Sequence, residues 1–454
     1  NAETQISMPR VHAIIGFGVT GQSVARHMLR NGTPCVVFDT RSPQRLSEEF
    51  RGIEVHWQIG QWSAAQLREY LSDVERLVVS PGLPLDLAIL LEARQLKLPI
   101  VSDIDLFFEA TSAPVIGVTG TNGKSTVVSL VGHIFNSLGQ ACGVGGNIGV
   151  AALDLLAQPR EQYVLELSSF QLERSAVLPF AASTVLNISD DHIDHHGSMQ
   201  NYRCAKLRIY RGAQRCVFNR GDLMTQPQAA EQLASFGLGA AADANSYGVV
   251  QSKGKRWITR GDELILPADQ LGLKGAHNLL NVMAALALVD SVLDVQDAAP
   301  AAAQFSSLDH RFQFIRTLDG VTYINDSKAT NVGATLAALQ GIGPDERTIL
   351  IAGGDAKGAD LQALAPALAE SVAGVVALGK DAAAVSAVAA AVGVDCVQVQ
   401  DMAAGVVAAR RMAADADMVL LSPACSSLDM YRNFAERGEV FAQAVHRLSS
   451  ELEV

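Results

Sequence analysis

The sequence predicts an α/β protein whose parallel sheets are divided among three domains. Short apolar runs typical of buried strands, such as VHAII, PVIGVTG and TILIAG, alternate with longer segments of helical periodicity. This alternation is the pattern of βαβ units. The length of 454 residues is that of about three domains. Two glycine-rich loops, near residues 16 and 120, are too far apart for one βαβ unit and therefore predict two separate nucleotide-type domains.

We place the domain boundaries near residues 102 and 307. Residues 1–102 and 103–307 each contain one glycine-rich loop, and residues 308–454 form a further αβ segment. Hydrophobic residues make up 49% of the chain and charged residues 18%, which provides several cores and argues against disorder. No apolar run reaches the roughly 18 residues of a membrane span, and no signal peptide is evident. We expect no membrane insertion.

Charge and cysteine usage narrow the class of protein. The net charge is −12, whereas a general nucleic-acid binder is usually basic, so we expect no nucleic-acid partner. An anionic ligand must then be bound by local positive sites, because the net electrostatic field of the protein would repel it. The six cysteines are scattered without CxxC spacing, which favours reduced thiols in a cytoplasmic protein over disulfides or a zinc site.

The first glycine-rich loop predicts a Rossmann-like domain that binds a phosphate-bearing ligand. Gly16, Gly18 and Gly21 stand in G-x-G-x-x-G order between a strand and a helix, and Asp39 ends the next strand. Glycines let the backbone approach a pyrophosphate, and the start of the helix favours its negative charge. The pattern suits NAD, FAD or a UDP-sugar equally, and a merely tight structural turn is the alternative.

The second loop predicts a triphosphate site in a domain of the P-loop ATPase type. Lys124 and Ser125 follow Gly123 at the start of an apolar-periodic helix. The strict G-x-x-x-x-G-K-[ST] pattern is broken, because Val118 occupies its first glycine position. The local arrangement is nevertheless kept: a strand, a glycine-rich turn with free N–H groups, a lysine and a hydroxyl that can bind magnesium. An ordinary strand-to-helix turn is the alternative.

Three features after this loop are candidates for metal chemistry. Glu166 ends a strand and could hold Mg²⁺ beside the loop hydroxyl. The segment SDDHIDHHG, which contains His192, suggests zinc or another transition metal when taken alone, but it equally fits a solvated acidic loop. Lys206 lies on a helical stretch, where a lone lysine is normally solvated.

Polar segments flank the apolar strands of the last third of the chain. In parallel sheets, ligands gather beyond the carboxyl ends of the strands. Each of these side chains would be unremarkable alone, and together they form a set of candidates: Arg311, Asp326, Lys328, Thr330, Lys357, Ser427 and Phe434.

The loop GTNGKS resembles the ATP loop of the Mur ligase family, which also departs from the strict spacing. Other segments agree with the family in the same order over almost the whole chain: GGNIG, LELSSFQLE, SDDHIDHHG, YRCAKLRIY, HNLLN, LDHRF, INDSKATN, GGDAKGAD and SPACSSLDMYRNF. The set is most similar to the D-glutamate-adding members, because the DNPR tetrapeptide of diamino-acid-adding relatives is absent. Folylpolyglutamate synthetase shares the ATP loop but lacks the domain that carries GFGVTG.

The resemblance implies ATP- and Mg²⁺-dependent ligation of D-glutamate to UDP-N-acetylmuramoyl-L-alanine through an acyl phosphate, in peptidoglycan precursor synthesis. It implies catalytic roles for Lys124, His192 and Lys206, the last resembling a lysine that is carbamylated in the family. It implies metal ligation by Ser125, Glu166, His192 and Lys206. The implied ATP-binding residues are Gly120, Thr121, Asn122, Gly123, Lys124, Ser125, Thr126, Asn278, Arg311 and Asp326.

The resemblance also divides the substrate-binding residues between two partners. Those implied for the UDP substrate are Val19, Thr20, Asp39, Thr40, Arg41, Gly82 and Asn147. Those implied for D-glutamate are Lys328, Thr330, Lys357, Ser427, Leu428 and Phe434. Two other functions have some support. An NAD-dependent oxidoreductase would use GFGVTG and Asp39 but gives no role to GTNGKST, and a non-catalytic nucleotide switch leaves the many lysine, carboxylate and histidine candidates unexplained.

Overall fold

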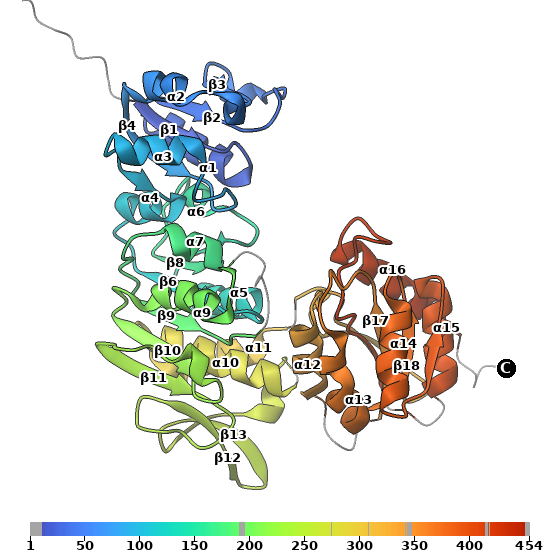
Figure 1. Cartoon of the computed structure of the whole chain (residues 1–454). Helices are drawn as coiled ribbons and strands as arrows, with labels where there is room; N and C mark the ends of the chain where they lie inside the picture. Colours follow the sequence, from blue (N-terminus) through green and yellow to red (C-terminus); the bar gives the residue numbers. More distant parts are fainter. Residues whose placement is uncertain are drawn as a thin grey trace, which may run out of the picture.

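The structure is a computed structural model that describes residues 11–189, 196–273, 275–306, 308–340, 342, 347–413, 416 and 418–449. Within these residues it contains three sheets of five, nine and six strands, which follow one another along the chain. In Figure 1 the first two sheets and their helices stack into one column, and the third unit lies beside the lower part of that column. The expectation of an α/β protein with three sheet-containing units is confirmed.

The N-terminal sheet is parallel, with strand order β3-β2-β1-β4-β5. Its order reverses between β1 and β4, and the first glycine-rich loop follows β1 at this switch point, where open α/β sheets bind their ligands. The strands are β1 (Val11–Ile15), β2 (Cys35–Phe38), β3 (Glu54–His56), β4 (Val74–Val79) and β5 (Ile100–Val101). The helices are α1 (Val19–Arg30), α2 (Ala64–Leu71) and α3 (Ala88–Gln95), with 3₁₀ turns at Glu48–Phe50 and Ile59–Gln61.

The central sheet has the order β14-β13-β12-β11-β10-β9-β6-β8-β7, parallel from β7 to β12 and extended by an antiparallel meander. Its strands are β6 (Val115–Thr119), β7 (Cys142–Gly146), β8 (Gln162–Glu166), β9 (Ala182–Val185), β10 (Arg215–Asn219), β11 (Gln232–Phe236), β12 (Tyr247–Ser252), β13 (Lys255–Arg260) and β14 (Glu263–Pro267). Its helices are α4 (Asp103–Ala110), α5 (Lys124–Ser137), α6 (Ala152–Leu155), α7 (Ser169–Arg174), α9 (Met199–Leu207), α10 (Ala276–Val289) and α11 (Val295–Gln304), with 3₁₀ turns at Arg208–Tyr210, Leu223–Thr225 and Ala268–Gln270.

The C-terminal sheet has the order β15-β16-β20-β17-β18-β19, and only β15 runs antiparallel to its neighbour. Its strands are β15 (Gln313–Leu318), β16 (Val321–Asn325), β17 (Thr348–Gly353), β18 (Val372–Leu378), β19 (Cys396–Gln398) and β20 (Met418–Leu421). Its helices are α12 (Val332–Gln340), α13 (Ala365–Ser371), α14 (Ala382–Ala391), α15 (Met402–Met412) and α16 (Phe434–His446), with a 3₁₀ turn at Leu361–Leu364.

The N-terminal and central sheets share a hydrophobic core, whereas the C-terminal sheet has its own. One apolar cluster joins Ile14 and Val24 of the N-terminal unit to Phe107, Leu153 and Tyr163 of the central unit. Two further clusters cover the two faces of the C-terminal sheet. The first two units are therefore packed as one body through apolar contacts. Among the residues that the structure describes, no helix is long and apolar enough to cross a membrane.

Asp103, at the start of α4, is expected to make the stability of the fold depend on pH. The side chain is 3% exposed, and burial raises its pKa to about 7. Because the folded state holds this proton at pH values where the unfolded chain has lost it, Asp103 lowers stability as the pH rises from about 4 to about 7. Asp103→Asn imitates the protonated form, so we expect its Tm at pH 8 to exceed that of the wild type by about 2 °C or more.

Thermal unfolding between pH 4.5 and pH 8 tests this expectation. Near pH 4.5 the Tm values of the variant and the wild type should converge. Asp73→Asn changes an exposed carboxylate in the same part of the chain and serves as the control. A Tm for Asp103→Asn that lies below that of the wild type at pH 8 would contradict the argument.

Candidate functional site

The three glycines of the first glycine-rich turn have different geometric roles. Gly16 has φ +88°, which favours glycine, and its N–H donates to Phe38 O at 2.8 Å. A Cβ on Gly21 would lie 1.9 Å from Gly16 O, so only glycine allows α1 to pack this closely against the turn. A Cβ on Gly18 would meet nothing within 4 Å, which leaves the start of α1 open to a ligand. The turn therefore fits a bound phosphate.

Asp39 fixes the segment that follows β2. Its carboxylate accepts hydrogen bonds from Phe17 N at 2.7 Å and from Arg41 N, Nε and Nη2 at 2.8, 2.9 and 2.7 Å. Burial alone would raise the pKa of Asp39, but these hydrogen bonds and the Arg41 charge lower it overall. Asp39 thus remains ionised and joins the glycine turn to the Thr40–Arg41 segment, which is exposed.

The structure brings together most of the residues expected around the UDP substrate. Val19, 75% exposed, and Thr20 open helix α1, while Thr40 and Arg41 follow β2. Gly82 follows β4 on an adjacent loop, whose Ser80 Oγ donates to Gly16 O at 3.2 Å. Asn147 is different, because it lies in the central unit beyond β7 and contacts Glu166.

The second glycine-rich loop forms a cradle at the start of α5. Gly120 and Gly123 have φ +151° and +84°, and Gly123 directly precedes the helix. Lys124 Nζ donates to Gly120 O at 2.9 Å and to Thr121 O at 2.8 Å, so the ammonium lies over the turn. The Asn187 side chain, in the segment after β9, holds the loop by accepting from Asn122 N at 2.8 Å and donating to Asn122 O at 3.0 Å.

A pair of oxygen ligands lies beside this cradle. Ser125 Oγ donates to Glu166 Oε2 at 2.5 Å, and Asn147 Nδ2 donates to Glu166 Oε1 at 3.3 Å. Ser125 and Glu166 are 5% and 4% exposed, which leaves a carboxylate and a hydroxyl together in a buried position. Hard oxygen donors of this kind suit Mg²⁺ bound with phosphate oxygens, so the residues fit the expected ion. Thr126, also buried, follows Ser125 in the first turn of α5.

Lys206 is buried against the same loop, 2% exposed. Its Nζ donates to Gly120 O at 2.9 Å and to Thr119 Oγ1 at 3.5 Å, and lies 4.7 Å from the centre of the Tyr202 ring. Tyr202 in turn places its hydroxyl 3.2 Å from Thr121 Oγ1. The interpretation of Lys206 as a solvated lysine is therefore wrong. His192 lies outside the described residues, as does most of the acidic and histidine-rich segment around it.

Charged groups of the C-terminal unit face the cradle. Burial lowers the pKa of Lys328, and the positive charges of Arg311 and Lys124 lower it further, against the opposing effect of Glu166. Burial also lowers the pKa of Arg311, and the charges of Glu166 and Asp326 oppose that shift. The folded chain thus gathers these groups from two units within electrostatic range of one another.

Asp326 and Asn278 lie near these charged groups. Asp326 accepts from Ser422 Oγ at 2.8 Å and from Phe312 N at 3.1 Å, and burial raises its pKa to about 7. Asn278 is buried on α10 and accepts from Asn281 Nδ2 at 3.3 Å. The Asn281 side chain lies against Gly123, where a Cβ would approach its Oδ1 to 2.6 Å, so the Asn278 position adjoins the second glycine-rich loop.

The candidates for the amino-acid substrate lie at the carboxyl edge of the C-terminal sheet. Lys328 Nζ lies 4.3 Å from the centre of the Phe434 ring, and Thr330 follows in the same loop, its N–H donating to Lys328 O at 2.8 Å. Ser427 is 3% exposed, whereas Leu428 is 64% exposed. Lys357 is exposed on the loop after β17, which pairs with the loop after β20 through the Asp355–Ser426 bridge.

Arg437 is a site-forming residue that the sequence analysis missed. It is 2% exposed, and its guanidinium donates to Ser327 Oγ, Ser327 O and Cys425 O at 3.0, 2.8 and 3.0 Å. Ser327 Oγ donates to Phe434 O at 2.7 Å. One buried cation therefore joins the segments that carry Lys328, Ser427 and Phe434. A helix arginine is normally exposed, so no pattern in the sequence distinguishes this one.

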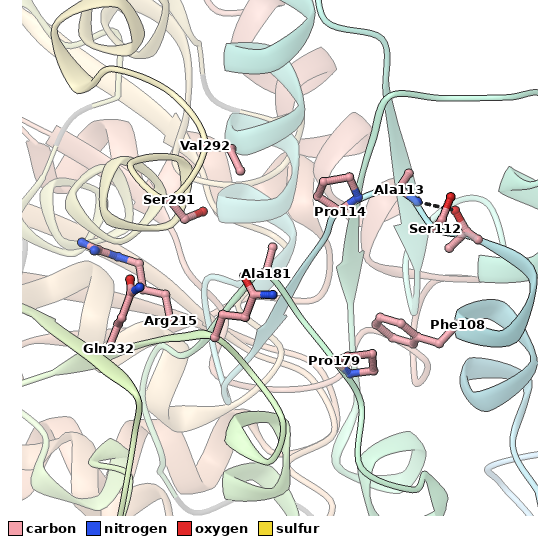
Figure 2. Close-up of a pocket in the computed structure, with 12 residues that line it drawn as sticks. Phe108, Ser112, Ala113, Pro114, Pro179, Ala181, Arg215, Gln232, Ser291 and Val292 are labelled. Atoms are coloured by element: carbon pink, nitrogen blue, oxygen red, sulfur yellow. Dashed lines mark hydrogen bonds between the residues drawn. The ribbon is translucent and has the colours of Figure 1, made fainter.

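Figure 2 shows a cavity elsewhere in the central unit, with a volume of about 420 Å³. Pro114, Ala181 and Arg215 line it near the amino ends of β6, β9 and β10. The second glycine-rich loop is at the opposite, carboxyl ends of these parallel strands. This cavity contains none of the predicted site residues, and its Arg215 is already engaged with Ala287 O at 3.1 Å and Asp290 at 3.3 Å.

Three family models match this chain, one for each of its three units. Residues 10–102 match the Mur ligase MurD-like N-terminal domain, residues 118–289 the Mur ligase middle domain, and residues 310–425 the Mur ligase glutamate ligase domain. UDP-N-acetylmuramoylalanine--D-glutamate ligase of Pseudomonas aeruginosa is 42% identical over 98% of this chain and 99% of its own length. The enzyme of the same name from Legionella pneumophila is 41% identical over 96% and 99%. The chain belongs to the Mur ligase family.

Solved structures of other ligases share the fold of this Mur ligase at much lower identity. A pseudomurein peptide ligase type C from Methanothermus fervidus has a TM-score of 0.62 at 17% identity, covering 97% of this chain and 100% of its own. MurF ligase of Thermotoga maritima, in complex with ADP, has a TM-score of 0.59 at 15% identity, covering 96% and 95%. At these identities the likeness concerns the fold alone, and the family membership rests on the sequence matches.

Proposed function

We propose that this Mur ligase is an ADP-forming amide ligase that joins D-glutamate to UDP-N-acetylmuramoyl-L-alanine in peptidoglycan precursor synthesis. Its near full-length identity of about 42% to relatives named for this reaction carries the proposal. The geometry supports it, because a phosphate-binding turn, a triphosphate cradle and a cluster of cations occupy the three units of the chain. The cytoplasm is the compartment in which such a nucleotide-linked substrate and ATP would meet.

Each substrate is assigned to residues of particular units, and the proposed boundaries between these units lie near residues 102 and 307. The open start of α1 and the Thr40–Arg41 segment hold the UDP moiety of the first substrate. The loop from Gly120 to Thr126 holds the ATP phosphates, with Asn278, Arg311 and Asp326 at the adenosine end. D-Glutamate occupies the region of Lys328, Thr330, Lys357, Ser427, Leu428 and Phe434. Asn147 receives the peptide end of the first substrate next to Glu166.

Amide formation requires an activated carboxyl group. The alanyl carboxylate attacks the γ-phosphorus of ATP, ADP leaves, and an acyl phosphate is formed. Lys124 neutralises charge between these two anions, and Ser125 and Glu166 would hold Mg²⁺, which supplies further neutralisation of phosphate charge. The uncharged amine of D-glutamate then attacks the acyl carbon, a proton is lost from nitrogen, and phosphate leaves. Lys124 and the nearby Lys328 add positive charge where the negative charge of the tetrahedral species develops.

Lys206 acts in this proposal as a carbamate. Its amine would form an N–C bond with CO₂ and release a proton, which converts a cation into a carboxylate-like group. The side chain is buried, and burial favours the neutral amine that this reaction needs. A carbamate supplies the oxygen that Mg²⁺ prefers. Together with Glu166 and His192 it completes the proposed set of metal ligands.

ADP release tests the whole assignment. We expect release to require both UDP-N-acetylmuramoyl-L-alanine and D-glutamate, and L-glutamate to give a rate at least about a hundredfold lower, because a mirror-image amino acid misplaces the attacking amine. Rapid ADP release without an amino acid would instead indicate a nucleotide switch. Equal rates with D- and L-glutamate would contradict the proposed specificity, and NAD binding detected by titration would favour an oxidoreductase.

A further inference from the structure

An ion pair joins the N-terminal and central units through helices α1 and α6. Arg26 Nε donates to Asp154 Oδ1 at 3.0 Å, and Arg26 Nη2 donates to Asp154 Oδ2 at 2.7 Å. The two side chains are 29% and 20% exposed, so solvent only partly reaches the pair. Two parallel bonds from a planar guanidinium to one carboxylate fix orientation as well as distance.

Neighbouring contacts hold both partners in place. The Arg26 guanidinium lies 5.8 Å from the centre of the Phe50 ring, and Arg26 Nη1 lies 3.4 Å from Glu49 Oε1, both within the N-terminal unit. One turn further along α1, Arg30 Nη2 donates to Leu153 O at 2.8 Å. Under these polar contacts, Val24 and Leu153 belong to the shared apolar cluster. The pair is thus a fixed cross-link between two surfaces that are already packed together.

The two helices lead directly to the two ends of the proposed first substrate. Helix α1 begins at Val19, immediately after the glycine turn that fits the UDP phosphates. Helix α6 follows the loop of Asn147 and precedes strand β8, which ends at Glu166. The ion pair therefore links the helix that begins at the phosphate-binding turn to the helix that follows the loop of Asn147.

We propose that Arg26 and Asp154 are positioning residues that hold the UDP-linked substrate in register with the ATP cradle. The inference rests on the proposed function, since it assigns the two ends of the substrate to these two units. The ATP loop lies wholly in the central unit and is held by Asn187 of that unit. Loss of the pair therefore disturbs the UDP substrate and the phosphoryl transfer to it, and leaves ATP binding unchanged.

The test uses Arg26→Gln, Asp154→Asn and the double variant in the full chain. We expect each single variant to raise the KM for UDP-N-acetylmuramoyl-L-alanine and lower kcat, with about a tenfold loss of kcat/KM, while the KM for ATP stays within twofold. The double variant should lose far less than the product of the two single losses, because both changes remove the Arg26–Asp154 pair, although Asp154→Asn also removes the contact with Arg30 Nη1 at 3.8 Å. Arg26→Lys keeps the charge but not the fork, so its loss should be intermediate.

Glu49→Gln is the matched control, because it removes the ion pair that Arg26 makes within its own unit and leaves the cross-link intact. It should behave as the wild type. Unchanged kinetics in both single variants, additive losses in the double variant, or equal rises in both KM values would overturn the proposal. The dissociation constant of the UDP substrate, measured without ATP, reports on the pair apart from catalysis. Absence of D-glutamate-dependent ADP release in the wild type would instead contradict the proposed function.

Discussion

Replacing Lys124 with alanine will lower the rate of ADP release by about a thousandfold or more and leave the chain folded. The ammonium lies over the loop at the start of α5, bound to Gly120 O and Thr121 O, where ATP phosphates would replace those carbonyls as its partners. Lys206 Nζ also donates to Gly120 O, at 2.9 Å, but as the proposed carbamate it cannot supply this positive charge. Neutralisation of the charge on the transferred phosphoryl group is therefore lost.

Steady-state ADP release and thermal unfolding measure the two halves of this expectation. Lys255→Ala removes an exposed hairpin lysine of the same unit and controls for the change in net charge. We expect the Tm of Lys124→Ala to stay within about 2 °C of the wild type, since its two hydrogen bonds are only partly buried and go to backbone carbonyls of its own loop. Turnover within threefold of the wild type would show that Lys124 does not bear on the chemistry.

Substitution of Lys206 should have an effect of similar size, and its pattern distinguishes carbamate from cation. An ammonium about 4 Å from a metal ion is repelled by an energy on the order of 4 kcal/mol per unit charge at an effective dielectric near 20. A carbamate reverses the sign of this interaction. Lys206→Arg keeps a cation but cannot form the carbamate, so we expect it to be as inactive as Lys206→Ala.

Small carboxylic acids provide the complementary measurement. Acetate or formate added to Lys206→Ala should restore part of the turnover by occupying the vacated space beside Gly120 and Tyr202 with an anionic oxygen ligand. The same acids should not restore Lys124→Ala, where a cation is missing. Substantial activity in Lys206→Arg, together with no rescue of Lys206→Ala, would mean that Lys206 acts as an ammonium.

Local patterns in the sequence predicted the secondary structure around each glycine loop. In GFGVTG, Gly16 has a positive φ and Gly21 has no space for a Cβ, which is the steric logic of the motif. The placement of Lys124 and Ser125 at the start of a helix was equally local, because a strand, a glycine turn and an apolar helical period follow one another without a gap. Such features depend on neighbouring residues and can therefore be read along the chain.

Residue patterns were thus enough to predict the α/β class, the order of the two glycine loops and, through resemblance, the family. The folded chain was needed to show that Lys206 is buried against Gly120, that Arg437 lies inside the C-terminal unit, and that Arg26 contacts Asp154. Each of these contacts joins residues that are far apart in the sequence or that lie on different sides of a loop. Whether a lysine or arginine is solvated or buried depends on which surfaces pack together, and hydrophobic periodicity fixes which face of an element is apolar but not which partner covers it.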